Sequence, residues 1–167
     1  SLNAALKKLS AEKYEDNEIV KASRSELEAL VGSTGVRVAP THGDYAPWNT
    51  LHLADHRLFV FDWEYFSHSA PLLSDMFQRI FMPDWLVCHL TPLDATNKLI
   101  DLQSDPRLQG LLQRLEIKEK EFIACVLLYL LRQGFRNADD SGIPAYIQSC
   151  LHRVITRLDD FSARTTT

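Results

Sequence analysis

The sequence has few cysteines, no long apolar run and no excess of basic residues, and each shortage argues against a class of protein. The three cysteines, Cys88, Cys125 and Cys150, are odd in number and lie among apolar residues, which is typical of reduced core cysteines in a cytosolic protein. The most apolar run, residues 122–131, has about half the length needed to cross a bilayer. The 18 Lys and Arg residues are scattered among 22 Asp and Glu residues, so no basic patch marks a nucleic-acid site. We therefore expect a cytoplasmic protein that binds neither nucleic acid nor a membrane.

The sequence also has no internal repeat, low-complexity tract or linker that would divide it. Its 167 residues, 46% of them hydrophobic, have the size and core-forming content of one ordinary domain. We therefore expect a single domain over residues 1–167. The first residue is Ser1 rather than Met, which favours an N-terminus that was processed or cut from something longer.

The first 40 residues predict helix followed by a short strand. Residues 1–31 are charged and helix-prone, and Ser25 followed by Glu28 fits a capping box, so a helix is expected to restart there. The Gly-Ser-Thr-Gly run that follows should end the helix. A strand is expected over residues 36–39, and Pro40 should start a loop.

Two short strand-like runs follow that loop. Residues 50–53 and 58–61 are separated by four residues, which is hairpin spacing. A hairpin here would fold Asp62 back beside Asn49, although thirteen residues separate the two in the sequence.

The sequence after Asp62 is helical in character. The expected helices are one capped by Ser74 and ended or kinked by Pro83, one containing Leu93 to Leu102, one opened by Asp105 and Pro106, a central apolar helix over residues 118–137, and one announced by Ser141 and Pro144. Together with the small β element, these helices predict an α+β fold that is mostly α-helical.

Three oxygen-bearing residues lie in the loop and at the end of the hairpin. Asp44, in a loop where a carboxylate can stay exposed and ionised, precedes Asn49 by five residues, and Asp62 follows Asn49 by thirteen. Each alone has an ordinary structural explanation, as an Asx-turn, a cap or a strand-end residue. Together they offer a general base, a neutral oxygen ligand and a charged oxygen ligand, which Mg-dependent phosphoryl transfer requires.

The segment from His42 to Glu64 reads HGDYAPWNTLHLADHRLFVFDWE. It resembles the catalytic segment of the aminoglycoside phosphotransferase and choline kinase family, in which His-Gly-Asp, four variable residues and Asn precede a β-hairpin and a hydrophobic-Asp-Trp/Phe-Glu run. The resemblance implies the C-terminal lobe of a protein-kinase-like fold, with the hairpin carrying the metal site. It also implies Mg²⁺ and ATP (or GTP) as cofactors, and a small-molecule hydroxyl acceptor of aminoglycoside, choline, sugar or amino-alcohol type.

The resemblance further implies roles for the matching residues. Asp44 would be the catalytic base, and Asn49 and Asp62 would be the Mg²⁺ ligands. Glu64 would reach a second metal directly or through water, the alternative being a surface carboxylate.

Two residues would support this site. His42 would brace the loop, and its use as the base is the less favoured alternative. Asp75 would accept hydrogen bonds from backbone amides of the catalytic loop; its ordinary explanation is a carboxylate in the first turn of a helix, where it suits the dipole.

Aromatic residues near the motif could form an acceptor pocket by stacking on a sugar or enclosing a cation, or could simply belong to the core. The candidates are Trp48, Trp63, Tyr65 and Trp85.

The N-terminal lobe of that family has no counterpart here, because nothing before Val36 resembles a strand meander, a glycine-rich phosphate loop or a Val-Ala-x-Lys strand. The chain is therefore expected to be part of a longer phosphotransferase whose N-terminal lobe is its partner, or else a non-catalytic binding or scaffolding module. In the first case we expect negligible turnover from these 167 residues alone. A metal-dependent hydrolase using His42, His52 or His56 is a weaker alternative, because a ligand set of Asp and Asn suits Mg²⁺ better than Zn²⁺.

Overall fold

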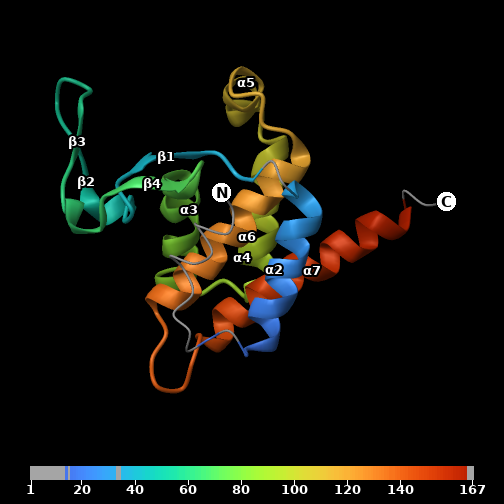
Figure 1. Ribbon diagram of the computed structural model, residues 1–167. Helices are drawn as coiled ribbons and strands as arrows, with labels where there is room; N and C mark the ends of the chain where they lie inside the picture. Colours follow the sequence, from blue (N-terminus) through green and yellow to red (C-terminus); the bar gives the residue numbers. More distant parts are fainter. Residues whose placement is uncertain (1–13, 15, 33–34, 165–167) are drawn as a thin grey trace.

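The computed structural model describes residues 14, 16–32 and 35–164, with side chains up to Leu158, and is mostly helical with two small sheets (Figure 1). The helices are α2 (Glu18–Val31), α3 (Ser74–Leu86), α4 (Pro92–Asp101), α5 (Pro106–Arg114), α6 (Glu119–Arg136) and α7 (Ala145–Arg164). The strands are β1 (Val38–Thr41), β2 (Thr50–His52), β3 (Leu58–Val60) and β4 (Ser67–Pro71), and the 3-10 turns are η2 (Pro47–Asn49), η3 (Trp63–Tyr65) and η4 (Leu102–Ser104). The expected class, α+β and mostly α-helical, is confirmed.

Helix α6 is the centre of the helical body. Every residue from Phe122 to Leu131 is buried, and α2, α3, α4 and α7 all contact this helix. Figure 1 shows α6 in orange, with α2 on one side and α3 on the other. Full burial of a Leu or Phe side chain contributes about 1.5–3 kcal/mol, so this run supplies a large part of the core. The predicted central helix is therefore confirmed.

Helix α2 begins at a cap that the sequence analysis placed too late. Asn17 is the N-cap, and its Oδ1 accepts hydrogen bonds from the backbone N–H groups of Ile19 and Val20. The capping box at Ser25 is wrong, because Ser25 lies inside a helix that has already started. The predicted end is confirmed, since Gly32 follows Val31 with a positive φ of 47°. The helix expected within residues 1–13 lies outside the described part of the chain.

Helix α3 differs from its prediction at both ends. Its N-cap position is Leu73 in a left-handed conformation, and Ser74 is the first helical residue, with its hydroxyl donating to Pro71 O (2.5 Å). Pro83 lies within α3, and the helix continues to Leu86. The backbone N–H groups of the next two residues donate to the Pro83 carbonyl, so proline precedes the end of the helix by one turn.

Helices α5 and α7 begin where the sequence indicated. Asp105 is the N-cap of α5 and accepts a hydrogen bond from Arg107 N–H (2.8 Å), with Pro106 as the first helical residue. α7 follows Pro144, and its buried residues Ile147, Cys150, Leu151 and Val154 have the expected helical spacing.

Strand β1 pairs with a strand that was not predicted. β4 lies antiparallel to β1, with Val38 opposite Pro71 and Ala39 opposite Ala70. Pro40 belongs to β1 rather than to a loop, and the register shifts around it, because proline has no N–H to give the ladder. β4 has the sequence Ser-His-Ser-Ala-Pro, whose residues have weak strand propensity, so its partner strand defines it.

The predicted hairpin is confirmed as β2 and β3, with Thr50 opposite Val60 and His52 opposite Leu58. Figure 1 shows it projecting away from the helices. Several of its side chains are apolar and exposed: Leu51, Leu53, Leu58 and Phe59.

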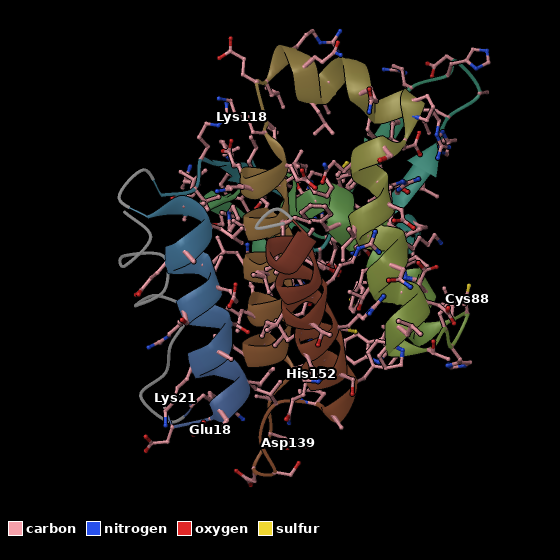
Figure 2. All side chains as sticks on the ribbon, turned by 90° about the vertical axis from the view of Figure 1, so that its right-hand side faces the viewer. Glu18, Lys21, Cys88, Lys118, Asp139 and His152 are labelled. Atoms are coloured by element: carbon pink, nitrogen blue, oxygen red, sulfur yellow. The ribbon has the colours of Figure 1, made fainter. Side chains whose placement is uncertain are left out.

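The cysteines are divided between core and surface. Cys125 and Cys150 are buried, as predicted for core thiols, but Cys88 is exposed. Figure 2 shows Cys88 at the edge of the molecule, beyond the end of α3. Its apolar neighbours Leu86 and Val87 are exposed as well, so apolar sequence context did not imply burial here. None of the helices in the described ranges is both long and apolar enough to span a membrane.

Candidate functional site

The loop at residues 42–49 is tied to the first turn of α3 by one carboxylate. Asp75 Oδ2 accepts a hydrogen bond from His42 N–H (2.7 Å), and Oδ1 accepts one from Gly43 N–H (2.9 Å). Consecutive backbone amides thus converge on one anion, as in a backbone nest. This is the contact that the family resemblance implies for Asp75, and it adds to any interaction with the dipole of α3.

The imidazole of His42 is buried, with both ring nitrogens engaged. Nδ1 lies 3.2 Å from Asp44 N and accepts its hydrogen, while Nε2 lies 2.8 Å from the Phe61 carbonyl oxygen. Because a carbonyl oxygen only accepts, the ring proton belongs on Nε2 and the Nδ1 lone pair is in use. His42 therefore braces the loop against the end of the hairpin, and this geometry argues against its use as the base.

Glycine is required at position 43. Gly43 has a φ of +84°, and a Cβ there would clash with the Tyr65 carbonyl oxygen. The turn η3 can therefore lie directly against the loop only because this residue has no side chain.

The carboxylate of Asp44 is held from two sides. Oδ1 accepts a hydrogen bond from Gln78 Nε2 (2.6 Å), and Oδ2 accepts one from Asn49 Nδ2 (2.9 Å). The side chain is only 16% exposed, so the expectation of an exposed carboxylate is wrong. An ionised carboxylate has about four lone-pair sites, so accepting one hydrogen bond at each oxygen leaves acceptor capacity for a substrate hydroxyl.

Asn49 is oriented by the same loop. Its Nδ2 donates both to the Asp44 side chain and to the Asp44 carbonyl oxygen (2.8 Å), and the residue is 4% exposed. The amide oxygen is therefore directed away from Asp44. Within the described ranges this oxygen has no hydrogen-bond partner.

The hairpin brings the last member of the motif back to the loop. Phe61 N–H donates to the Asn49 carbonyl oxygen (3.2 Å), which continues the β2–β3 register by one residue and leaves Asp62 next in the chain. The predicted return of the chain from Asn49 to Asp62 is confirmed. Asp62 is exposed and has a left-handed backbone (φ 65°, ψ 61°), which is unfavourable for a non-glycine residue.

The side-chain oxygens of Asn49 and Asp62 fit Mg²⁺ better than a metal that needs three or more side-chain ligands. Among the described residues no three His, Cys, Asp or Glu side chains are placed to hold a metal, so Asp44, Asp62 and Glu64 do not form a three-carboxylate site. Mg²⁺ keeps several waters and is commonly held by one or two protein oxygens. Asn49 Oδ1 and the Asp62 carboxylate are the oxygens available here, while Glu64 lies exposed on η3.

The histidines of the hydrolase alternative do not converge. His42 is buried in the loop, whereas His52 and His56 are exposed on the hairpin. In the part of the chain that the structure describes, no two of these histidines are joined by a third His, Cys, Asp or Glu side chain in a group that could hold a metal, which also argues against this alternative.

Two arginines that the sequence analysis did not single out flank the loop. Arg136 of α6 donates to Gly43 O (2.9 Å), lies 3.5 Å above the Tyr65 ring and has its Nη2 3.7 Å from Asp44 Oδ1. Arg79 of α3 lies 5.1 Å from the centre of the Tyr45 ring. The sequence offered one hint of this role for Arg136: it is a basic residue at the end of a helix whose middle is apolar.

The four aromatic candidates do not form one pocket. Trp63 packs on the His42 ring (4.5 Å between centroids), Tyr65 is covered by Arg136, and Trp48 is exposed. Trp85 stacks on Tyr146 and lies two turns of α3 beyond Gln78, about 10 Å along the helix axis. The structure therefore separates Trp85 from the loop.

A cavity of about 450 Å³ lies beside His42. Of the four aromatic candidates only Trp63 lines it, and Asp44 does not. Its lining residues are Pro40, His42, Tyr45, Val60, Trp63, Phe66 and Asp75. Tyr45, within the loop itself, is thus an aromatic residue beside His42 that the site prediction left out.

Comparisons of this chain with known proteins found no matching family model, no matching curated protein and no matching solved structure.

Proposed function

We propose that this chain is the metal-side and acceptor-side lobe of an ATP-dependent (or GTP-dependent) phosphotransferase that acts on a hydroxyl of a small molecule. The observation that carries the proposal is the pair of hydrogen bonds made by Asn49: its side chain donates to Asp44, and its carbonyl oxygen accepts from Phe61 N–H, which leaves Asp62 next in the chain. Three separate structural explanations for Asp44, Asn49 and Asp62 would not require Asn49 to connect the loop to the end of the hairpin.

Asp44 is the proposed base. It is held at both oxygens yet keeps acceptor capacity, so it can orient a substrate hydroxyl. As the acceptor oxygen forms its bond to the γ-phosphorus, the bond between that phosphorus and the nucleoside diphosphate oxygen breaks. The hydroxyl proton passes to the Asp44 carboxylate late in the transfer.

Asn49 and Asp62 are the proposed Mg²⁺ ligands, with Glu64 as a further candidate through water. Bound Mg²⁺ would neutralise charge on the nucleotide phosphates. The protein's own contribution is orientation: Asn49 donates to Asp44 through its nitrogen, which leaves its oxygen for the metal. One amide thus links the base to the metal site.

The proposal includes an N-terminal lobe in the same parent chain. The hairpin supports this, because it projects from the helical body (Figure 1) and its apolar side chains are exposed, with Leu51 at 54% and Phe59 at 53%. Exposed apolar surface of this kind commonly marks an interaction site. The lobe would supply the nucleotide phosphate contacts, and we expect negligible turnover without them.

The test is phosphoryl transfer by the full natural polypeptide that carries this sequence. It would be incubated with labelled ATP or GTP, Mg²⁺ and a panel of aminoglycosides, choline, amino-alcohols and sugars. We expect transfer to at least one hydroxyl acceptor, and a decrease of about 10²–10⁴-fold in Asp44→Asn. Asp55→Asn is the control, because Asp55 is an exposed carboxylate in the hairpin turn that pairs with Arg57. Absence of transfer to every acceptor, or equal rates in both variants, would contradict the proposal.

A non-catalytic binding module is the second candidate, and the exposed apolar hairpin favours it too. It predicts that Asp44→Asn and Asp62→Asn leave the biological activity of the parent protein intact. Replacing Leu51 and Phe59 by Ser would then abolish that activity.

A further inference from the structure

Three polar side chains occupy the interior where α3 packs on α6. Gln78 of α3 and Tyr129 of α6 are each 1% exposed, and Gln133 of α6 is 2% exposed. Burying an amide or hydroxyl without hydrogen bonds costs free energy, so such groups persist in a core only where their partners are supplied. Their hydrogen bonds connect them to one another and to Asp44 in the loop.

The hydrogen bonds of Gln78 leave its amide one orientation. Its Oε1 accepts from the Tyr129 hydroxyl (2.9 Å) and from Gln133 Nε2 (2.8 Å), which uses both lone pairs of the oxygen. The nitrogen must therefore face the other way, and there it donates to Asp44 Oδ1 (2.6 Å). Rotating the amide by half a turn would place two donors against its nitrogen and an oxygen against the carboxylate.

The two donors on α6 are fixed in turn. Burial raises the pKa of the Tyr129 phenol well above its ordinary range, so the hydroxyl stays protonated and able to donate. Gln133 Oε1 lies 3.5 Å from Asn137 Nδ2, a distance at the limit of a hydrogen bond, which directs the Gln133 nitrogen toward Gln78. The direction of donation is thus set from α6 through Gln78 to Asp44.

The hydrogen bonds from Tyr129 and Gln133 to Gln78, and from Gln78 to Asp44, form a relay. This relay holds Oδ1 of Asp44, the carboxylate oxygen that Asn49 does not hold. Oδ2 is held by Asn49, whose own position depends on the loop and the hairpin, whereas Oδ1 is held from the helical core. The Tyr129 ring also packs against Phe77 and Phe81 of α3, at 5.7 Å between centroids in each case, so the relay is embedded in rigid packing. Side chains locked in this way are what orient a catalytic group within a few tenths of an ångström.

We propose that Gln78, oriented by Tyr129 and Gln133, is a positioning residue that fixes the carboxylate of Asp44 for proton transfer. The inference rests on the proposed function of Asp44 as the base. It assigns Gln78 no contact with substrate, and it predicts that removing a hydroxyl in the helical core slows the chemical step.

The principal variant is Tyr129→Phe, which removes the hydroxyl and keeps the ring. The matched control is Tyr146→Phe, because the Tyr146 hydroxyl donates to Leu90 O (2.8 Å) and Tyr146 packs with Trp85, away from the loop. Gln78→Leu is the stronger variant, since it removes the donor to Asp44 itself. Each would be made in the full natural polypeptide for kinetics and in the 167-residue chain for spectroscopy.

In steady-state kinetics we expect kcat to fall about 10-fold in Tyr129→Phe and up to about 100-fold in Gln78→Leu, with KM for the nucleotide unchanged. Tyr146→Phe should retain the kcat of the unmodified protein. Unchanged kcat in Tyr129→Phe and Gln78→Leu, or a fall in kcat that Tyr146→Phe shares, would overturn the inference.

The second readout is the solvent exchange of the Gln78 side-chain N–H protons, followed by NMR in the 167-residue chain. We expect exchange to be about 10-fold faster or more in Tyr129→Phe than in Tyr146→Phe, because one of the two donors that orient the amide is lost. Equal exchange in both variants would show that the relay does not exist. If the unmodified protein transfers no phosphate, the proposed function fails and so does the catalytic part of this inference, while the exchange rates still decide the relay by themselves.

Discussion

Replacing Asp75 by Asn is the change that best separates a supporting carboxylate from an ordinary helix-capping one. Asp75 lies in the first turn of α3, where any carboxylate would interact favourably with the helix dipole. It also accepts hydrogen bonds from two consecutive loop amides, at 2.7 and 2.9 Å. Asn has the same shape but one oxygen, so the variant tests the second role specifically.

The expected loss of stability follows from those two bonds. A hydrogen bond to a charged group contributes about 1.5–3 kcal/mol, and an unpaired buried donor costs about 1–3 kcal/mol. In Asp75→Asn one loop amide keeps a neutral acceptor, and the other faces an NH₂ group. We therefore expect the free energy of unfolding to fall by about 2–4 kcal/mol, whereas loss of a dipole interaction alone would cost about 0.3–1 kcal/mol.

The control is Asp94→Asn. Asp94 lies in the first turn of α4 and accepts a hydrogen bond from the Thr91 hydroxyl (2.7 Å), which an Asn oxygen can also accept. Urea unfolding at pH 7 would be followed by tryptophan fluorescence and circular dichroism for both variants. Equal losses below about 1 kcal/mol in the two variants would refute the reasoning, because Asp75 would then act through the dipole alone.

Three further predictions concern other parts of the molecule. A hydrogen-bonded ion pair with Arg37 (2.7 Å) holds the pKa of Glu121 below its usual range. The stability that Glu121 adds over Glu121→Gln, under about 1 kcal/mol at pH 7, should therefore be complete above the ordinary Glu pKa and be lost as the pH falls below it, through the lowered pKa of the folded state; urea unfolding of both proteins over a descending pH series measures it. Gly43→Ala should disrupt the loop, because a Cβ at position 43 clashes with the Tyr65 carbonyl oxygen. Gly110→Ala should instead stabilise α5 by about 0.5–1 kcal/mol, because nothing lies within 4 Å of a Cβ there; thermal unfolding of both variants measures the two opposite effects. A thiol reagent should modify the exposed Cys88 rapidly in the native protein. Cys125 and Cys150 should react only after denaturation, because they are buried and burial raises the pKa of both thiols; mass spectrometry counts the modified sites.

Local chemistry in the sequence predicted the parts of the fold that form locally. The hairpin follows from two apolar runs at hairpin spacing, and the start of α5 follows from Asp105 and Pro106, because each depends on neighbours in the chain. The return of Asp62 to Asn49 was predictable for the same reason.

Parts that depend on distant partners were missed. β4 exists because β1 pairs with it, and Pro40 is tolerated in β1 because the register shifts around it. Gln78 and Arg136 reach Asp44 across 34 and 92 residues of sequence, respectively, and neither spacing is visible in a pattern. A Gln on the buried face of α3 was the available signal, since a polar residue there requires partners.

The most direct test of the proposed site is the binding of Mn²⁺, as a paramagnetic substitute for Mg²⁺, to the 167-residue chain, measured by water-proton relaxation. We predict that Asn49→Ala and Asp62→Asn each weaken binding by about 10-fold or more, while Asp55→Asn, at the opposite end of the same hairpin, leaves it unchanged. Binding of equal strength in the unmodified chain and all three variants would contradict a metal site at Asn49 and Asp62.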